Sequence, residues 1–480
     1  MAHRARAHQS KRFVRAAGRV KLGCAGCDRL GSKGERVTNA IDTACTHQHF
    51  SPVHLFSYIG GALHCEGVSL EEVAAQFGTP AYVYSAGTIR ENFRRLDLAL
   101  SSLDHLICYA VKANSNLAIL DLLAREGAGF DIVSAGELFR VLKAGGRADR
   151  CTFAGVGKTA GEIAYALREG VYCFNVESEP ELARINDVAG SLGLIAPVAL
   201  RVNPDVDART HKFISTGKSK NKFGIGLDRA ADVYAFASEL PHIRIRGIQT
   251  HIGSQILEAA PFAEAAEKLA ALAADIHARH HIEFLSIGGG IGIIYEGALA
   301  SGTPAWWTSP ALPHRMTPED YAAAIVPALA PLGLRILFEP GRFLVGNAGA
   351  LLSTVQYVKT TPAKTFTIVD AAMNDLIRPA LYDGRHEIVP LKESQDPATR
   401  MDVVGPVCES GDFFAQDREI PPLAAGERIA LLSAGAYGFV MSSNYNSRPL
   451  LPEILVDGKD VRQIRRRQSL DDLIAGETIP

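Results

Sequence analysis

Eight short apolar segments, each ending in small or polar residues, lie along residues 106–342 and restrict the possible folds more than any other feature of the chain. Stretches with helical periodicity, such as AEAAEKLAALAADIHARH, separate them. Regular alternation of strands and helices is typical of a parallel sheet with helical crossovers. The eight segments are LICYAVKANSN, GFDIVSAGEL, TFAGVGKT, CFNVES, ALRVNPD, IRGIQTHIGSQ, FLSIGGGIG and RILFEPGR.

Polar residues at so many successive strand ends favour a closed (β/α)8 barrel. A barrel brings the carboxyl ends of all its strands to one rim, where the functional groups of this fold lie. A doubly wound open sheet is the alternative, but it gives no reason for polar residues at every strand end. The sequence therefore predicts a parallel, TIM-like barrel in an α/β protein.

The sequence pattern changes on both sides of the predicted barrel. After about Gly346, segments such as ALLSTVQYVKT, KTFTIVDA and RIALLSAGAY follow one another with few helices between them, which is typical of an antiparallel β-domain. The strand-like segment LFSYIGGALHCEG is expected to pair with that domain. We therefore predict four parts: a basic extension (1–48), an N-terminal segment joining the β-domain (49–84), the barrel (85–345) and an antiparallel β-barrel or sandwich (346–480).

The composition excludes several classes of function. The formal net charge is -2, so no global field attracts nucleic acid or an anionic membrane. No apolar run approaches the roughly 20 residues that cross a bilayer. The eight cysteines are scattered through the chain, which favours reduced thiols and a cytoplasmic location. A small molecule or a second copy of the chain is the expected partner.

Residues 1–48 differ from the rest of the chain. They carry ten Lys or Arg against three acids and have no sustained periodicity, which predicts a poorly ordered extension. Cys24 and Cys27 form a CxxC motif within it, but no second ligand pair stands at a suitable spacing, so we predict no metal site.

Lys112 is the most informative single residue. It follows the apolar strand ICYAV directly, so a barrel would place its amine at the functional rim. A solvated surface lysine is the alternative for this residue taken alone. Other segments supply a possible phosphate cradle, a ring-stacking imidazole, a hydroxyl and a carboxylate, which together with an amine meet the requirements of pyridoxal phosphate. The residues concerned are Gly288, Gly289, Gly290, His251, Ser254 and Glu339.

Several motifs in order resemble one family. The chain from about residue 68 to 475 is similar to the fold-type III pyridoxal-phosphate decarboxylases (group IV), and within them to the diaminopimelate decarboxylases. The shared motifs are YAVKAN, HIGSQ, SIGGGIG, EPGR, GPVCESGD and GAYGF, and HKFISTGKSKNKFGI at 211–225 also fits. On this resemblance Lys112 holds the cofactor covalently.

The resemblance also implies roles for the remaining site residues. Glu339 pairs with the ring nitrogen of pyridoxal phosphate, and His251 stacks on its face. The residues implied to bind the cofactor are Lys112, His251, Ser254, Gly288, Gly289, Gly290, Glu339, Gly341, Arg342 and Tyr437. Those implied to bind the distal end of the substrate are Arg342, Arg378, Tyr382, Glu409 and Tyr437.

Cys408 resembles the family's proton donor and, with Lys112, completes the implied catalytic pair. In the family this cysteine and the following glutamate come from the partner subunit, so the resemblance implies a homodimer with shared active sites. The implied reaction is decarboxylation of meso-2,6-diaminopimelate to L-lysine and CO2, the last step of lysine biosynthesis.

Two alternatives stay open at this point: a decarboxylase of another basic amino acid, of ornithine or arginine type, and a catalytically silent regulatory homologue. Two features depart from the family pattern. The basic start has no counterpart, and residues 296–316, EGALASGTPAWWTSPALPHRM, form a longer connection than expected and carry both tryptophans. That segment follows a rim strand, so it is either a surface excursion or a lid that affects access.

Overall fold

The computed structural model describes residues 53–207, 222–312 and 315–480. The basic extension, its CxxC motif and most of the segment 211–225 lie outside the described residues. Phe50–Pro480 forms one compact unit, and no helix in its described part is long and apolar enough to span a membrane. The domain boundaries given above stay predictions.

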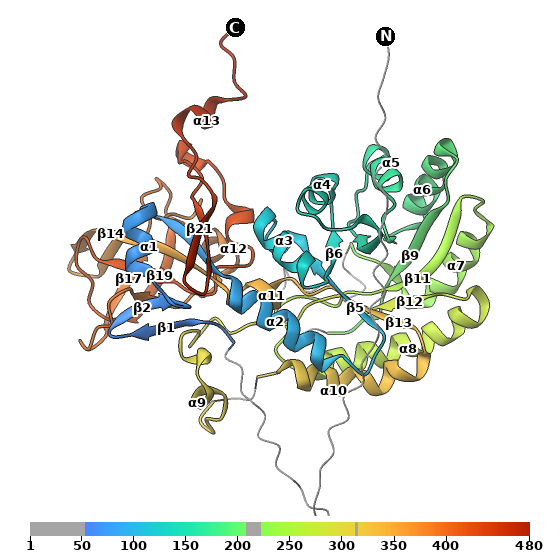
Figure 1. Ribbon diagram of the computed structural model, residues 1–480, viewed down its shortest axis with the longest axis horizontal. Helices are drawn as coiled ribbons and strands as arrows, with labels where there is room; N and C mark the ends of the chain where they lie inside the picture. Colours follow the sequence, from blue (N-terminus) through green and yellow to red (C-terminus); the bar gives the residue numbers. More distant parts are fainter. Residues whose placement is uncertain (1–52, 208–221, 313–314) are drawn as a thin grey trace, which may run out of the picture. The chain divides into compact units, whose positions relative to one another are not determined.

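The predicted barrel is confirmed: eight parallel strands of the described residues close on one another, because β8 pairs with β9. Each coincides with one of the eight sequence segments, and helices surround them (Figure 1). The strands are β5 (His105–Ala110), β6 (Gly129–Ile132), β7 (Cys151–Phe153), β8 (Cys173–Val176), β9 (Ala196–Asn203), β11 (Ile243–Gln249), β12 (Phe284–Ser286) and β13 (Arg335–Phe338). A short strand, β10 (Ile225–Gly226), adds to β9.

Helices follow the strands in the order that the sequence predicts. Ser134, Thr159 and Ser178 cap three of them, each accepting the N–H of the residue three positions later. Such caps fix where a helix leaves the rim and contribute about 1 kcal/mol each. The helices are α3 (Leu117–Arg125), α4 (Ala135–Lys143), α5 (Ala160–Glu169), α6 (Glu179–Leu192), α7 (Ala230–Glu239), α8 (Ala260–His280) and α10 (Pro318–Leu329); α2 (Ala86–Ala99) precedes β5.

The barrel interior has an apolar floor and a polar upper layer. Leu106, Cys108, Cys173, Ala199, Phe284 and Leu337 form one buried cluster inside it. Side chains two positions apart on a strand share a face, so the next inward residues toward the carboxyl ends are Ala110, Asn175, Arg201, Ser286 and Glu339. These are buried as well, so the fold gathers polar groups just below the rim.

The β-domain surrounds a long central strand, β14 (Gly349–Thr360). Its pairings are mainly antiparallel, but β15–β17 and β4–β20 are parallel, so the sheet is mixed. Strand β4 (Ala81–Ser85) lies between β14 and β20. The other strands are β15 (Thr365–Val369), β16 (Ile388–Pro390), β17 (Thr399–Val404), β18 (Phe413–Ile420), β19 (Arg428–Leu431), β20 (Glu453–Asp457) and β21 (Asp460–Arg465).

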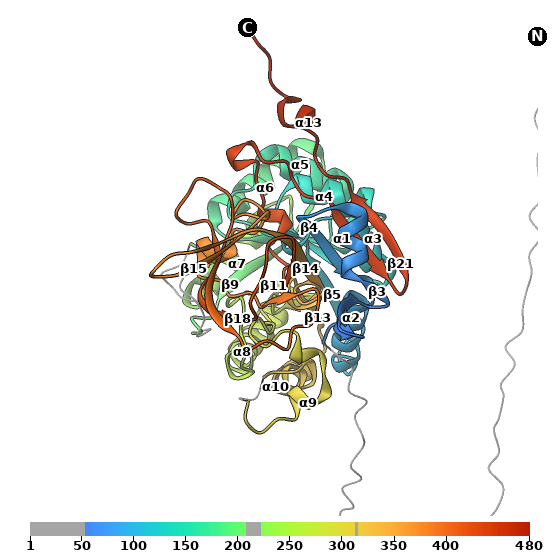
Figure 2. The same cartoon turned by 90° about the vertical axis from the view of Figure 1, so that its left-hand side faces the viewer.

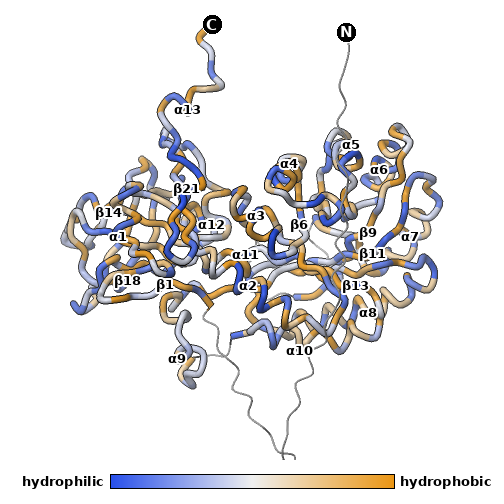
Figure 3. Tube along the Cα trace, viewed as in Figure 1, coloured by the Kyte–Doolittle hydropathy of each residue, from blue (hydrophilic) through white to orange (hydrophobic). Residues whose placement is uncertain are grey.

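The N-terminal strands make a separate small sheet against this domain. β1 (Phe56–Ile59), β2 (Ala62–Cys65) and β3 (Val68–Ser69) pair with one another. The link to the β-domain is a backbone bond from Leu63 N–H to Leu391 O (2.7 Å) and a shared apolar cluster that includes residues of β4 and β14. Figure 2, in which the left-hand side of Figure 1 faces the viewer, shows α1 (Leu70–Phe77) and β4. In Figure 3, β13 is mainly hydrophobic, whereas β21 carries strongly hydrophilic residues.

Candidate active site

Lys112 lies at the rim directly after β5, in a short 3-10 turn (Val111–Ala113). Its half-buried amine forms an ion pair with Asp131, an inward residue of β6 that is itself buried. Burial is the largest single effect and works to lower the pKa of Lys112. The charge and hydrogen bond of Asp131, together with Tyr437 and Glu137, outweigh it, so the pKa is raised. Asp131 Oδ1 is buried and has no hydrogen-bond partner among the residues that the structure describes. The amine is therefore held at the rim by a carboxylate that still has accepting capacity.

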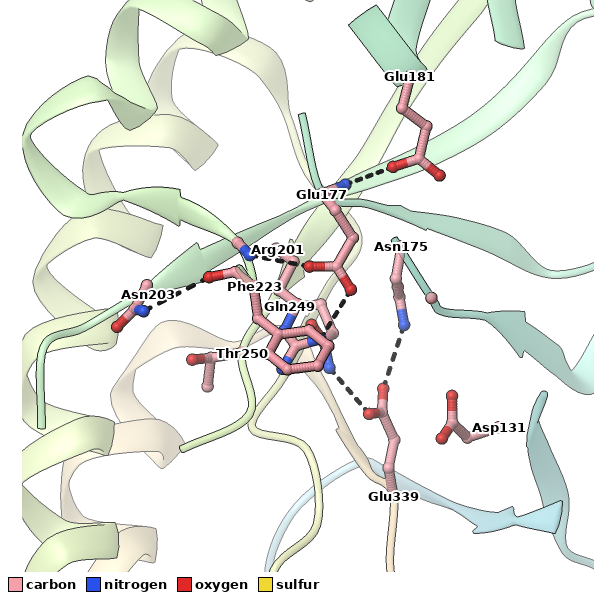
Figure 4. Close-up of polar contacts among 12 residues, drawn as sticks. Asp131, Asn175, Glu177, Glu181, Arg201, Asn203, Phe223, Gln249, Thr250 and Glu339 are labelled. Carbon is pink, nitrogen blue, oxygen red and sulfur yellow. Dashed lines mark hydrogen bonds and ion pairs between the residues drawn. The ribbon is translucent and has the colours of Figure 1, made fainter. Parts of the chain in front are cut away.

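Glu339 follows β13 and lies in the same polar layer. Its carboxyl group accepts hydrogen bonds from Ser286 Oγ (2.8 Å), Gln249 Nε2 (2.9 Å) and Asn175 Nδ2 (3.4 Å). Figure 4 shows Asn175 and Gln249 turned toward Glu339, with Asp131 beside it. Burial, aided by the charge of Asp131, raises the pKa of Glu339 to about 7. A positively charged donor would therefore suit this carboxyl group well.

His251 lies beyond the end of β11, over the glycine loop. Its Nδ1 accepts the Gly289 N–H (3.2 Å). Desolvation and the nearby cations Arg201 and Lys112 hold the pKa of His251 well below its usual value. A neutral imidazole fixed by its own hydrogen bond can stack flat against an aromatic ring.

The sequence predicts that the glycines of SIGGGIG form a phosphate cradle, but two of them are needed for close packing of the backbone. A Cβ on Gly288 would lie 2.3 Å from Thr250 O, and one on Gly289 would lie 2.1 Å from Glu339 O. The N–H groups of these two glycines bond to Ser286 Oγ and His251 Nδ1. Of the three glycines, only Gly290 lines the cavity at the rim, which is described next. Gly290 is therefore the one whose backbone can contact a phosphate.

A cavity of about 230 Å³ joins these groups at the rim. It fits pyridoxal phosphate, because it brings an amine, a buried carboxyl group and a neutral imidazole together. The buried acceptors Asp131 Oδ1 and Gln249 Oε1, both from residues of its lining, have no hydrogen-bond partner in the described part of the chain. The predicted cofactor residues that line it are Lys112, His251, Ser254, Gly290, Glu339, Gly341, Arg342 and Tyr437.

A larger cavity of about 500 Å³ adjoins the first and shares four lining residues with it: His251, Ser254, Arg342 and Tyr437. Arg378 and Tyr382, from α12 (Arg378–Tyr382) of the β-domain, line its far part. The structure therefore brings four of the five predicted distal residues into one place, namely Arg342, Arg378, Tyr382 and Tyr437.

Two arginines that line this cavity, Arg342 and Arg378, have no acidic partner among the described residues. Buried Arg342 donates to the hydroxyl groups of Tyr295 (2.6 Å) and Ser254 (3.0 Å), and its Nε has no partner. Arg378 Nε donates to His386 (3.3 Å), and its guanidinium lies 4.8 Å from the centroid of the Tyr295 ring. Burial lowers the pKa of Arg378. Two largely buried cations without carboxylates make this cavity a receptor for an anion.

Cys408 and Glu409 do not join the other predicted residues. Both are exposed, and neither is among the described residues that line the two cavities. Their loop is held instead by Asn446 Oδ1, which accepts the Cys408 N–H (3.1 Å), and by Asp412, which accepts the Val407 N–H (2.7 Å).

Sequence reasoning missed several polar residues of the barrel interior, namely Asp131, Asn175, Gln249, Ser286 and Arg201. Asp131, Asn175 and Ser286 are each the one polar residue of a short apolar strand, and that was the available signal; Gln249 and Arg201 lie in strands with other polar residues. Arg201 forms a buried ion pair with Glu177 (2.7 Å) and faces Phe223, with its guanidinium 4.8 Å from the centroid of that ring (Figure 4).

The fold and these groups define a class: barrel enzymes that bind pyridoxal phosphate. The family model for the pyridoxal binding domain of pyridoxal-dependent decarboxylases matches residues 86–346. Diaminopimelate decarboxylases of Vibrio cholerae and Pseudomonas aeruginosa are 49% and 50% identical over 87% and 88% of this chain, and 97% and 99% of their own length is covered. The chain belongs to the diaminopimelate decarboxylase family, and its cofactor is pyridoxal phosphate.

Solved structures agree with this assignment. Diaminopimelate decarboxylase from Helicobacter pylori, complexed with L-lysine, has a TM-score of 0.79 at 42% identity and covers 85% of this chain and 98% of its own. The M. jannaschii enzyme, also with L-lysine, has a TM-score of 0.82 at 34% identity over 90% and 99% of the two chains. A lysine/ornithine decarboxylase from Vibrio vulnificus, at 24% identity and a TM-score of 0.68, shares the fold.

Proposed function

We propose that this decarboxylase converts meso-2,6-diaminopimelate to L-lysine and CO2, the last step of lysine biosynthesis. The observation that carries the proposal is the adjoining pair of cavities. One holds the amine of Lys112 and the carboxyl group of Glu339, and the other holds Arg342 and Arg378 without carboxylate partners. A substrate with one amino acid head at each end matches both.

The rival substrates lack a group for the second cavity. Ornithine and arginine carry a single carboxylate, which a decarboxylase must place at the reacting end. A desolvated arginine without an anion costs free energy that no such substrate offsets. Arg378 therefore favours a substrate with a distal carboxylate. A silent regulatory role is disfavoured because Lys112 and Glu339 line one cavity.

In the proposed mechanism Lys112 holds the cofactor covalently, Glu339 pairs with its ring nitrogen and His251 stacks on its face. When bound, pyridoxal phosphate supplies an electron sink for the pair left at the α-carbon as CO2 departs. Ser254, Gly290, Gly341 and Tyr437 are the proposed phosphate-end residues, with Gly288 and Gly289 shaping the loop.

At the distal end of the substrate, Arg342 and Arg378 bind the carboxylate, and Tyr382 and Tyr437 complete the contact. Charge-assisted, bidentate bonds of this kind select a planar carboxylate. Cys408 delivers a proton to the α-carbon, and Glu409 receives the distal ammonium group.

We further propose that the protein acts as a homodimer, in which Cys408 and Glu409 reach the cavities of the partner subunit. Two observations support this arrangement: both residues are exposed, and neither is among the described residues that line the cavities of their own subunit. We also propose a cytoplasmic location, which the five unpaired cysteines of the described residues support.

The test is direct. The holoprotein is incubated with meso-diaminopimelate, and L-lysine and CO2 should appear in equal amounts, whereas ornithine, arginine and lysine should release little CO2. Borohydride should trap the cofactor on Lys112 and bleach its near-visible absorbance. Faster CO2 release from ornithine or arginine, or trapping at another residue, would overturn the proposal.

A further inference from the structure

The connection 296–316 borders the larger cavity at both of its ends. Tyr295 and Glu296 line the cavity where the chain leaves the barrel, and Arg315 lines it where the chain returns toward α10. Between these points the chain forms a short 3-10 turn (Ala300–Gly302) and α9 (Pro304–Trp307), which projects below the rest of the unit in Figure 1. The connection therefore contributes directly to the wall of the predicted substrate site.

Hydrogen bonds fix this connection to the body of the protein. The Leu299 N–H donates to Glu387 (2.7 Å), whereas Trp307 Nε1 donates to Ser301 O (2.8 Å) within the connection itself. His54 is buried and bonds to Ala298 O (2.5 Å). At the other end the Met316 N–H bonds to Leu257 O (3.4 Å), next to Arg315. Anchors on both sides hold the return of the chain at the cavity.

The charges around the cavity do not balance. Its lining includes four arginines, Arg315, Arg342, Arg378 and Arg385, and one acid, Glu296. That acid already pairs with Arg385 (2.9 Å). Arg342 and Arg378 bond to neutral groups, as described above, and Arg315 forms no ion pair with any described residue. Among the described residues, three cations therefore line the cavity without an acidic partner, one more than the sequence analysis assigned to the distal carboxylate.

We propose that Arg315 is a specificity-determining residue that binds the distal carboxylate of the substrate together with Arg342 and Arg378. This inference rests on the proposed function, because it takes diaminopimelate as the occupant of the cavity. The connection 296–316 is then a substrate-recognition element and not a surface excursion. A third guanidinium can engage a lone pair of a carboxylate whose other contacts are already fixed by two arginines.

Two ligands that do not react separate charge recognition from general damage. L-Lysine keeps the distal carboxylate, and cadaverine is the same diamine without it. If Arg315 binds that carboxylate, its loss weakens inhibition by L-lysine and leaves inhibition by cadaverine unchanged. A merely structural role would weaken both, since both need the same cavity shape.

The experiment compares holoenzyme variants R315Q, R315K and R95Q. Arg95 is the matched control because it lines, with Arg315, a smaller cavity beside the same connection, but it pairs with Glu319 (2.8 Å) and does not line the larger cavity. R315Q should raise the KM for meso-diaminopimelate and the Ki for L-lysine about 10-fold, as expected for loss of one charge-assisted bond, with kcat within about 2-fold. R315K should show a smaller rise, and R95Q should match the wild type.

Each other result has a defined meaning. Unchanged KM and L-lysine Ki in R315Q, or equal losses for L-lysine and cadaverine, would overturn the inference. If R315Q does not fold, the KM and the two Ki values of R315K decide in the same way. Failure of the proposed function looks different, because the wild-type holoenzyme would then release no L-lysine from meso-diaminopimelate.

Discussion

Glu339 shows how burial and hydrogen bonding compete at a single residue. Three donors surround its carboxyl group, and each favours the ionised form. Its pKa is nevertheless raised to about 7, because burial and the neighbouring charge of Asp131 act more strongly in the opposite direction. Glu137, close to Lys112, has its pKa raised to about 7 for the same leading reason, which is burial. The barrel mouth therefore holds carboxyl groups whose ionisation is unfavourable unless a cation is supplied.

This imbalance predicts the pH dependence of the cofactor-free protein. The pKa of Glu339 is higher when folded than when unfolded, so its stabilising contribution is complete below pH 4.5 and is lost as the pH rises through about 7. The difference amounts to roughly 3 kcal/mol. Unfolding free energies measured in denaturant from pH 5 to 8 should therefore fall with pH, and fall less steeply in E339Q. Equal slopes for the two proteins would contradict the prediction.

At the scale of elements, the barrel followed from the sequence because all eight of its strands end in recognisable motifs. Strand β18 was missed, since FFAQDREI carries four polar residues among its eight and resembles a surface segment. The parallel pairing of β4 with β20 could not be predicted from the sequence either. These segments lie far apart in sequence, and their partnership depends on the packing of the whole sheet.

The candidate site was predicted in part for a related reason. The motifs located the residues that follow each strand, such as Lys112 and Glu339. They did not locate Asp131 or Gln249, which lie inside strands and point inward only because the barrel closes. Arg315 was missed because a connection without periodicity gives no sign of where it returns.

The glycine loop after β12 predicts a strong effect of a single methyl group. In G289A the new Cβ would lie 2.1 Å from Glu339 O. This oxygen belongs to the backbone, so it cannot move aside as the end of a flexible side chain can. We expect a loss of at least about 2 kcal/mol in unfolding free energy and a lower cofactor content. G161A is the matched control, since a Cβ there meets nothing within 4 Å in helix α5, and it should be neutral or slightly stabilising. Wild-type stability in G289A would be inconsistent with this packing.

The loop that carries Cys408 gives a second test at this scale. Asn446, which accepts the Cys408 N–H, has a left-handed backbone (φ 55°). Glycine tolerates that conformation but removes the acceptor, whereas aspartate keeps it. We expect N446G to lower kcat about 3- to 10-fold and N446D to remain near wild type. If N446G turns over as fast as the wild type, Asn446 does not position Cys408.

Across the whole molecule, the barrel and the β-domain meet at the residues next to Lys112. The Tyr437 N–H donates to Ala113 O (2.8 Å), Asn114 Nδ2 donates to Gly435 O (3.1 Å) and Asn116 Nδ2 donates to Glu453 (2.8 Å). The segment that carries the amine is thus held by the domain that carries Arg378. This junction sets the spacing between the reacting end and the distal end of the site.

The proposed homodimer makes a prediction that a single subunit cannot fulfil. If each site combines Lys112 of one subunit with Cys408 of the other, K112A and C408A are each nearly inactive. Random pairing makes about half of the dimers mixed, and each mixed dimer has one intact site, so co-expression should restore about a quarter of wild-type activity. K112A with E339A is the control and should restore none, because both changes fall in barrel cavities and every site keeps one defect. If K112A and C408A show no recovery although mixed dimers are isolated, Cys408 does not serve the partner's site.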